Sequence, residues 1–205
     1  MAEQVLTDIS VLRTSPLAHL ESALEQGAVL GERGVSVREI AFMTQIGLRA
    51  EPGTEAHAAL AATTGVGLPA AVGQVAGNAD GTAVLWNGPD EFLLVAPDGT
   101  ELLDDLLRAL GQAPGQVVDL SANRTLIELA GPSARLVLEK GCPADLHPRS
   151  FGVGTAITTV LGPVPVLLWK SAEDTFRLLP RASFADYTAR WLLDAMAEFA
   201  SDPIV

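Results

Sequence analysis

Apolar residues recur every three or four positions in several stretches of this chain, and each such stretch predicts a helix with one buried face. The first helix is predicted to begin at Ser15-Pro16, where a capping hydroxyl precedes a proline suited to the first helical position, and to end near Gly27. A second helix is predicted after Thr100, whose hydroxyl is placed to cap it. The apolar positions are Leu17, Leu20 and Leu24 in the first helix, and Leu102, Leu103, Leu106, Leu107 and Leu110 in the second.

Three further helices are predicted from the residues that begin them. An alanine-rich helix begins at Thr54 and runs to about residue 63, and another begins at residues 131–133 and ends at Gly141. The last helix begins at Ser183, because Asp186 stands three residues later, as in a capping box. Its predicted buried residues are Phe184, Tyr187, Trp191, Met196 and Phe199.

Alternating or β-branched runs between these helices predict strands. A single strand is predicted at residues 37–49, because apolar and polar residues alternate from Thr44 onward. A further strand covers residues 124–130. Two hairpins are predicted, one from the runs 82–86 and 91–96 and one from the runs 164–170 and 175–179.

The two hairpins share a sequence pattern, LWNGPDEFLLVAP in the first half of the chain and LWKSAEDTFRLLP in the second. A predicted helix follows each of them. This internal duplication predicts an α+β protein with two related subdomains and mostly antiparallel sheets, whose apolar faces are buried together. We expect an N-terminal arm with a helix at residues 1–36, then a single domain at 37–205 made of two repeats, at about 37–115 and 116–205.

Composition and charge narrow the class of protein. The chain has 205 residues, of which 48% are apolar and 19% charged, and this balance indicates a globular fold. Its net charge of −12 disfavours binding to nucleic acid or to an anionic membrane surface. One cysteine excludes an intramolecular disulfide, and no run of about 20 apolar residues is present. The first ten residues lack the features of a secretory signal, so we expect a cytoplasmic protein.

The segment at residues 117–150 carries the densest candidate chemistry. Cys142 follows a predicted helix end, with Lys140 and His147 near it in sequence. A thiol beside a cation can be reactive, whereas a free cysteine is more often buried and structural, and the structural alternative is favoured. Asp145 and His147 could act as a base and its orienting partner, or belong to a loop whose side chains bond its own backbone, and the loop is favoured.

The remaining motifs do not support dinucleotide binding, metal binding or the stacking of a ligand. Residues 65–70 fit the G-x-G-x-x-A pattern of dinucleotide-binding loops, but no buried strand precedes them and no long helix follows. The three histidines do not have metal-ligand spacing. Trp86 and Trp169 occupy matching points in the two hairpins, and packing in the core or at an interface is favoured over stacking on a ligand.

Arg124 is a charged residue in a strand whose other positions look half buried. It can pair with Asp119 or with a carboxylate of a partner chain, and the sequence does not choose between them. No complete catalytic set is present, and no P-loop, serine-hydrolase or zinc-protease motif occurs. The sequence therefore favours a subunit or binding module over a free-standing enzyme.

Four segments resemble the gamma subunit family of bacterial heterotetrameric sarcosine oxidase. They are REIAFMTQIGLR, LWNGPDEFLLVAP, VVDLSANRTLIELAGPSARLVLEKGCPADLHPRSF and VPVLLWKSAEDTFRLLPRASFADYTARWLLDA. The resemblance covers residues 15–17 and nearly everything from Val37 to Ala195. The run KGCPADLHP and the two Leu-Trp hairpins come in the order that the family has.

The resemblance implies a fold similar to the folate-binding domain of aminomethyltransferases. That fold is a duplication of β-β-α-β-β-β-α units with exchanged first strands, which agrees with the internal repeat. On this basis residues 37–205 would form one folate-binding-like domain.

The resemblance also implies a role in a complex that oxidatively demethylates sarcosine to glycine with oxygen, releasing hydrogen peroxide. The one-carbon unit leaves as formaldehyde or passes to tetrahydrofolate. The implied partners are alpha, beta and delta subunits, with direct contact to alpha, and the implied FAD, FMN, NAD and zinc lie on those subunits. The chain itself is implied to have no catalytic, cofactor-binding or metal-binding residues.

The sequence departs from the folate-binding pattern in two places. The first-hairpin strand ends Val95-Ala96-Pro97, where aminomethyltransferases continue into an Asn-Ala segment near the folate. In the second hairpin Arg177 stands where those enzymes have an acid that reaches the pterin. Both departures favour a loss of folate binding.

Two alternatives remain open at this point. One is a stand-alone folate-binding protein of one-carbon metabolism or iron–sulfur maturation, whose Lys-Gly-Cys motif is similar to residues 140–142. That motif continues toward Gly-Gln-Glu, whereas this chain continues Pro-Ala-Asp. The other is a stand-alone enzyme that depends on Cys142.

Overall fold

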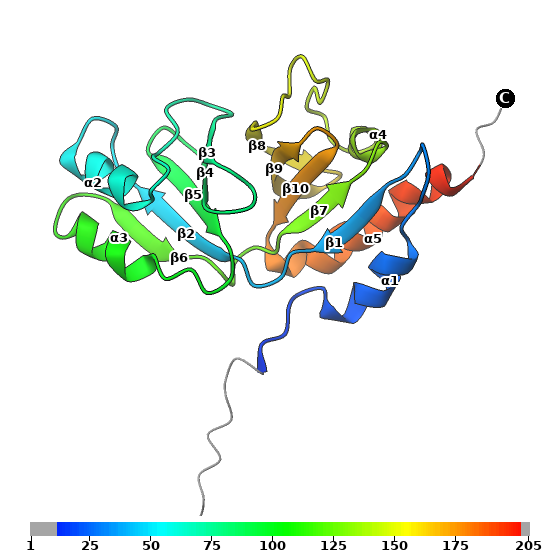
Figure 1. Ribbon diagram of the computed structural model, residues 1–205, viewed down its shortest axis with the longest axis horizontal. Coiled ribbons are helices and arrows are strands. Elements are labelled where there is room, and N and C mark those ends of the chain that lie inside the picture. The colour runs from blue at the N-terminus through cyan, green and yellow to red at the C-terminus, as the bar shows by residue number, and fades with distance from the viewer. Residues whose placement is uncertain (1–11, 202–205) are drawn as a thin grey trace, which may run out of the picture.

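A computed structural model describes residues 12–201 and contains two five-stranded antiparallel sheets, which face each other in Figure 1. The first ten residues, which suggested that no secretory signal is present, lie outside the described range. Within that range no helix is both long and apolar enough to cross a bilayer.

Each half of the chain runs in the order β-β-α-β-β-β-α, as the resemblance implied. The first half contains β1 (Ser36–Glu39), β2 (Thr44–Arg49), α2 (Glu55–Thr63), β3 (Val75–Gly77), β4 (Ala83–Trp86), β5 (Glu91–Ala96) and α3 (Leu103–Leu110). The second half contains β6 (Gln116–Asp119), β7 (Ile127–Ala130), α4 (Ala134–Glu139), β8 (Ala156–Leu161), β9 (Val164–Ala172), β10 (Thr175–Pro180) and α5 (Ala185–Met196). Before them stand a 3-10 turn (Ala18–Leu20) and α1 (Glu21–Gln26), and short 3-10 turns flank α5 at Ala182–Phe184 and Ala197–Ala200.

The first strand of each half belongs to the sheet of the other half. The strand orders are β1-β7-β10-β9-β8 and β3-β4-β5-β2-β6, so β1 pairs with β7 and β6 pairs with β2. Both sheets thus have the same order, with one borrowed strand at the edge. The predicted α+β class, with duplicated units and antiparallel sheets, is confirmed.

The prediction of one strand at residues 37–49 is wrong, because β1 and β2 lie in different sheets. The chain crosses between the sheets at residues 40–43, where Phe42 has a φ of 59°. A non-glycine residue in this left-handed region cannot continue a strand. The Arg13 guanidinium lies over the Phe42 ring, 4.1 Å from its centre. The alternating pattern therefore located β2 but could not reveal the crossing.

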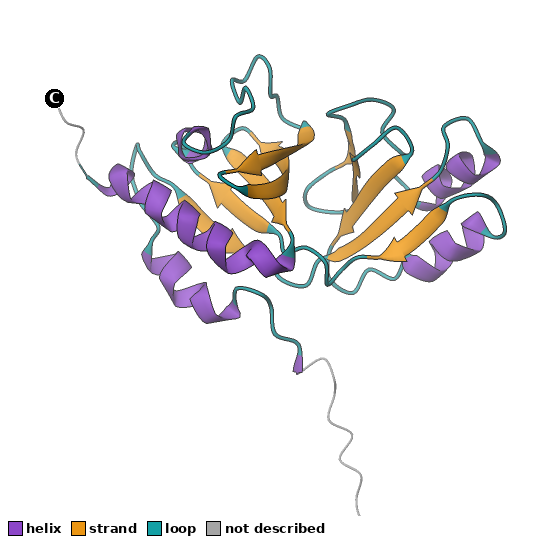
Figure 2. Cartoon of the chain, turned by 180° about the vertical axis from the view of Figure 1, so that it is seen from behind, coloured by secondary structure: helices purple, strands orange, loops and turns teal. Residues whose placement is uncertain are grey.

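Three clusters of buried side chains join the two sheets and their helices. One lies between the inner faces of the sheets, and the other two lie between each sheet and the helices on its outer face (Figures 1 and 2). The central cluster includes Met43, Leu85, Leu93, Val95, Leu126, Leu167, Trp169 and Leu179. Helices α2 and α3 cover the β3-β4-β5-β2-β6 sheet, while α1, α4 and α5 cover the other. The segment that carries α1 is thus part of the core, through Leu17, Leu20 and Leu24, although only Leu24 lies in the α-helix itself.

A row of charged residues crosses the three strands β1, β7 and β10. Arg38, Glu128 and Arg177 are direct neighbours in the strand register. Glu128 lies 2.6 Å from an Arg38 nitrogen and 3.2 Å from Nε of Arg177. Arg177 is only 7% exposed and also donates to the Ala79 carbonyl oxygen, at 2.7 Å. Glu128 is therefore the counterion of a buried cation and ties the borrowed strand to its new sheet.

The helix start predicted at Thr54 is confirmed, and the caps predicted at Ser15 and Thr100 are wrong. Thr54 accepts a hydrogen bond from the His57 backbone amide at 3.2 Å and caps α2. Ser15 instead donates to Glu39 Oε2 at 2.5 Å, and Thr100 donates to a carbonyl three residues earlier. Hydroxyls near helix starts have several local acceptors, and the sequence does not rank them.

The last helix begins without the predicted capping box. Phe184 is the N-cap of α5 and no side chain caps it, so the expectation for Ser183 and Asp186 is wrong. Phe184 and Tyr187 are 42% and 47% exposed, although burial was predicted. The buried face of α5 follows a spacing of three and four residues that leaves both of them outside it. That face consists of Ala185, Thr188, Ala189, Leu192, Ala195 and Met196.

Gly141 is required for packing and not for a left-handed helix end. Helix α4 ends at Glu139 with Lys140 as the C-cap, and Gly141 is absent from the glycines with positive φ. A Cβ atom at Gly141 would lie 2.5 Å from Cζ2 of Trp191. The indole of α5 thus packs directly on this backbone.

Replacing Gly141 by alanine should destabilise the fold, because the added methyl group would overlap the Trp191 ring. We expect a loss of about 1–3 kcal/mol in the free energy of unfolding, measured by urea denaturation of the full chain. Gly152→Ala is the control, since its Cβ would meet nothing closer than 4.0 Å. Equal losses in the two variants, or an unchanged loss when Trp191 is also replaced by valine, would contradict this account.

Replacing Glu128 by glutamine should destabilise the chain by about 3 kcal/mol, because the buried Arg177 would lose its counterion. Glu139→Gln is the matched control, since it removes an exposed pair with Arg135 and should cost no more than about 0.5 kcal/mol. Denaturant unfolding followed by far-UV circular dichroism measures both. Similar costs would show that the row of charges does not hold β1 in place.

Candidate functional site

Cys142 is part of the core that lies beneath α5. It is 7% exposed, its amide donates to the Leu138 carbonyl at the end of α4, and its Sγ lies 3.8 Å from Oγ1 of Thr159. Neither of these hydrogen bonds involves Asp145 or His147. Its burial agrees with the structural alternative.

Asp145 and His147 organise their own loop. The Asp145 carboxylate accepts from the His147 amide at 3.0 Å, and His147 Nδ1 accepts from the Arg149 amide at 3.2 Å. Hydrogen bonds from Ser150 and from the His147 amide hold the pKa of Asp145 below its usual value. All of these side chains are exposed, and the backbone bonds are those of the favoured loop interpretation.

The other sequence motifs do not assemble a site. The loop at residues 65–70 follows the end of α2 and leads into no helix, which is the wrong context for a dinucleotide. Trp169 is buried between the sheets and Trp86 packs beside α2 and α3, which fits the packing interpretation. Residues 12–201 contain no group of three or more histidine, cysteine or acidic side chains that could hold a metal ion.

Arg177, the position at which an acid was expected for folate binding, is a paired cation in β10. Its guanidinium is engaged by Glu128 and the Ala79 carbonyl and lies 5.2 Å from the centre of the Trp169 ring. Strand β5 ends at Ala96, which is fully buried.

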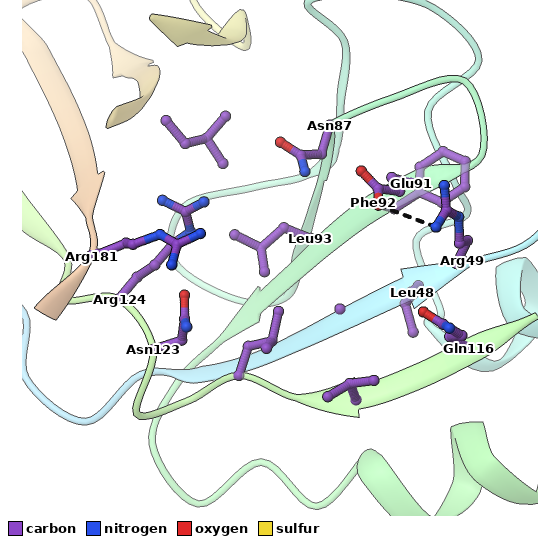
Figure 3. Close-up of a pocket in the computed structure, with 14 residues that line it drawn as sticks. Leu48, Arg49, Asn87, Glu91, Phe92, Leu93, Gln116, Asn123, Arg124 and Arg181 are labelled. Carbon is purple, nitrogen blue, oxygen red and sulfur yellow. Dashed lines mark ion pairs between the residues drawn. The ribbon is translucent and has the colours of Figure 1, made fainter. Parts of the chain in front are cut away.

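A polar cleft of about 320 Å³ lies where the two halves meet, and Figure 3 shows its lining. Apolar side chains of both sheets line it, including Leu93 of β5 and Leu167 of β9. At one end its polar side chains are Arg49, Glu91 and Gln116, and the Glu91 carboxylate lies 3.8 Å from an Arg49 nitrogen. Its other polar side chains come from the β4–β5 turn, the segment before β7 and the end of β10. They include Asn87, Asn123, Arg124 and Arg181.

Arg124 lines this cleft and does not pair with Asp119, which removes one of the two alternatives left open by the sequence. Asp119 accepts from the amide and hydroxyl of Ser121, at 2.9 and 2.6 Å, and these bonds lower its pKa. Arg124 donates one N–H to the Leu179 carbonyl at 2.9 Å. Burial and then the like charge of Arg181 lower the pKa of the Arg124 guanidinium.

Arg181 was not singled out from the sequence. Its backbone forms an isolated antiparallel bridge with Arg124, and Figure 3 shows the two guanidinium groups side by side. They are 57 positions apart in the chain (181 minus 124), so only the tertiary fold brings them together. An exposed arginine after a strand carries no signal in the sequence that could have found it.

Comparison with known proteins covers almost the whole chain. Residues 47–198 match the model of the sarcosine oxidase, gamma subunit family. The chain is 62% identical over 201 residues to the sarcosine oxidase subunit gamma of Corynebacterium sp. (strain U-96), which covers 98% of each chain. It is 57% identical over 204 residues to that of an Arthrobacter species, over the full length of both.

Solved structures give the same relationship. The fold superposes on a chain of the heterotetrameric sarcosine oxidase from Corynebacterium sp. U-96 with a TM-score of 0.93 and 63% identity, over 95% of this chain and 100% of that one. An aminomethyltransferase from Bartonella henselae matches with a TM-score of 0.62 and 21% identity, over 89% of this chain and 57% of that one, which shows a shared fold. The chain therefore belongs to the sarcosine oxidase gamma subunit family.

Proposed function

We propose that this chain is the gamma subunit of a cytoplasmic heterotetrameric sarcosine oxidase. Such a complex oxidises sarcosine to glycine and hydrogen peroxide, with the one-carbon unit released as formaldehyde or passed to tetrahydrofolate. The observation that carries the proposal is the match over 98% of both chains to a sarcosine oxidase gamma subunit, at 62% identity.

Within this complex the chain contributes structure and no reaction chemistry. Two observations support this part of the proposal. Cys142 is buried in the core. Arg177, at the position where folate-binding relatives carry an acid, is already paired with Glu128. FAD, FMN, NAD and zinc belong to the other subunits in this proposal. The alpha, beta and delta subunits are the partners, and alpha is the one in direct contact.

The proposed organisation has two parts. Residues 37–205 act as one folate-binding-like domain of two repeats, and residues 1–36 form an arm. Support for the arm as an anchored element comes from Leu17 and Leu24, which are 1% and 3% exposed and pack in the core beside α5.

Expression of the alpha, beta and delta subunits without this chain should give little assembled and active oxidase. The reason is that a structural subunit supplies a surface that its partners bury. Size-exclusion chromatography and sarcosine-dependent hydrogen peroxide production measure assembly and turnover, with the four-chain expression as the control. Normal assembly and turnover of the three remaining subunits would refute the structural role.

The isolated full chain should bind tetrahydrofolate no more tightly than a dissociation constant of about 1 mM. A guanidinium engaged by Glu128 replaces the acid that reaches the pterin, so the main polar contact is lost. Isothermal titration calorimetry measures the binding, with an aminomethyltransferase as the positive control. Micromolar binding by this chain would favour a stand-alone folate-binding protein instead.

A further inference from the structure

Arg124 and Arg181 stand apart from most arginines of this acidic chain. Seven of its eleven arginines form ion pairs with carboxylates. Arg124 and Arg181 form none with any residue of the range 12–201, although the chain carries 25 acidic residues. Both line the same cleft.

The fold holds these two positive charges close together. The backbone bridge between residues 124 and 181 places the two side chains next to each other, and the bond from Arg124 to the Leu179 carbonyl holds one guanidinium. Arg124 is half-buried and Arg181 is exposed at the rim. Two neighbouring cations repel each other. An anion bound between them attracts both, and this attraction outweighs the repulsion.

We propose that this cleft binds a small organic carboxylate, with Arg124 and Arg181 holding the carboxylate group. The planar guanidinium fork matches a carboxylate, and each arginine has N–H donors to spare. Leu93 and Leu167 provide an apolar surface for the body of the ligand, and Asn87, whose Oδ1 accepts from the Thr158 hydroxyl at 3.2 Å, also lines the cleft.

The dimensions and charge of the cleft select this class of ligand. A volume of about 320 Å³ is at the lower end of the range for small-molecule sites, which is too small for a nucleotide with its phosphates. The net charge of −12 also disfavours a polyanion. A compact, partly apolar molecule with a single negative charge fits both the volume of the cleft and the net charge of the chain.

Benzoate and its neutral isostere benzamide test the proposal on the full chain. We expect benzoate to bind with a millimolar dissociation constant by calorimetry and to raise the melting temperature, while benzamide does neither. Arg181→Gln, which changes an exposed side chain, should weaken benzoate binding at least tenfold. Arg124→Lys should weaken it as well, because a lysine keeps the charge but loses the fork.

Arg149→Gln is the matched control, since Arg149 is an exposed arginine that lies outside the cleft. It should leave benzoate binding unchanged. Absence of benzoate binding, or equal binding in Arg181→Gln and the parent chain, would overturn the proposal. It would also fail if Arg181→Gln weakened only assembly with the other subunits, because a partner's carboxylate would then be the occupant.

Discussion

The reciprocal exchange of first strands makes each sheet depend on both halves of the chain. Strand β1 completes the sheet of the second half, and β6 completes the sheet of the first. The inner faces then pack on each other through one apolar cluster that draws on both sheets and on the crossing residue Met43. Because neither half has a complete sheet of its own, burial of the inner faces and strand pairing stabilise the same arrangement. The helices, the charged row and the cleft all take their positions from it.

Local patterns predicted the elements whose stability is local. The hairpins β4–β5 and β9–β10 and the helix start at Thr54 were found because strand alternation and helix starts depend on a few neighbouring residues. The crossing at Phe42 was missed, since a left-handed residue that breaks a strand is imposed by the two sheets it connects. The need for Gly141 was assigned to the wrong cause, because its constraint comes from Trp191 on a helix 50 positions later (191 minus 141). Tertiary contacts of this kind leave no periodic signal.

For the candidate functional residues, too, the sequence identified the residues but not their tertiary contacts. The sequence located Cys142, Asp145 and Arg177 and gave the favoured interpretation of the first two from residue preferences alone. It could not find that Lys170 would be 2% exposed, with Nζ 3.5 Å from a carboxylate oxygen of Glu173, or that Arg124 and Arg181 would share a cleft. Charge pairing depends on which strands become neighbours. Here the strand order converts an isolated arginine at residue 177 into a neutralised part of the core.

The borrowed strand β1 is synthesised well before β7, the strand with which it pairs. Ser36 pairs with Ala130, which lies 94 residues later in the chain. At a synthesis rate of about 5–20 residues per second, β1 leaves the ribosome roughly 5–20 s before its partner strand exists. During that time its backbone amides and carbonyls form an open edge that can join any other unpaired strand. High contact order slows the later closure as well. During this interval a chaperone or an already synthesised partner subunit can bind the unpaired strand of the nascent chain and so affect whether it folds or misfolds.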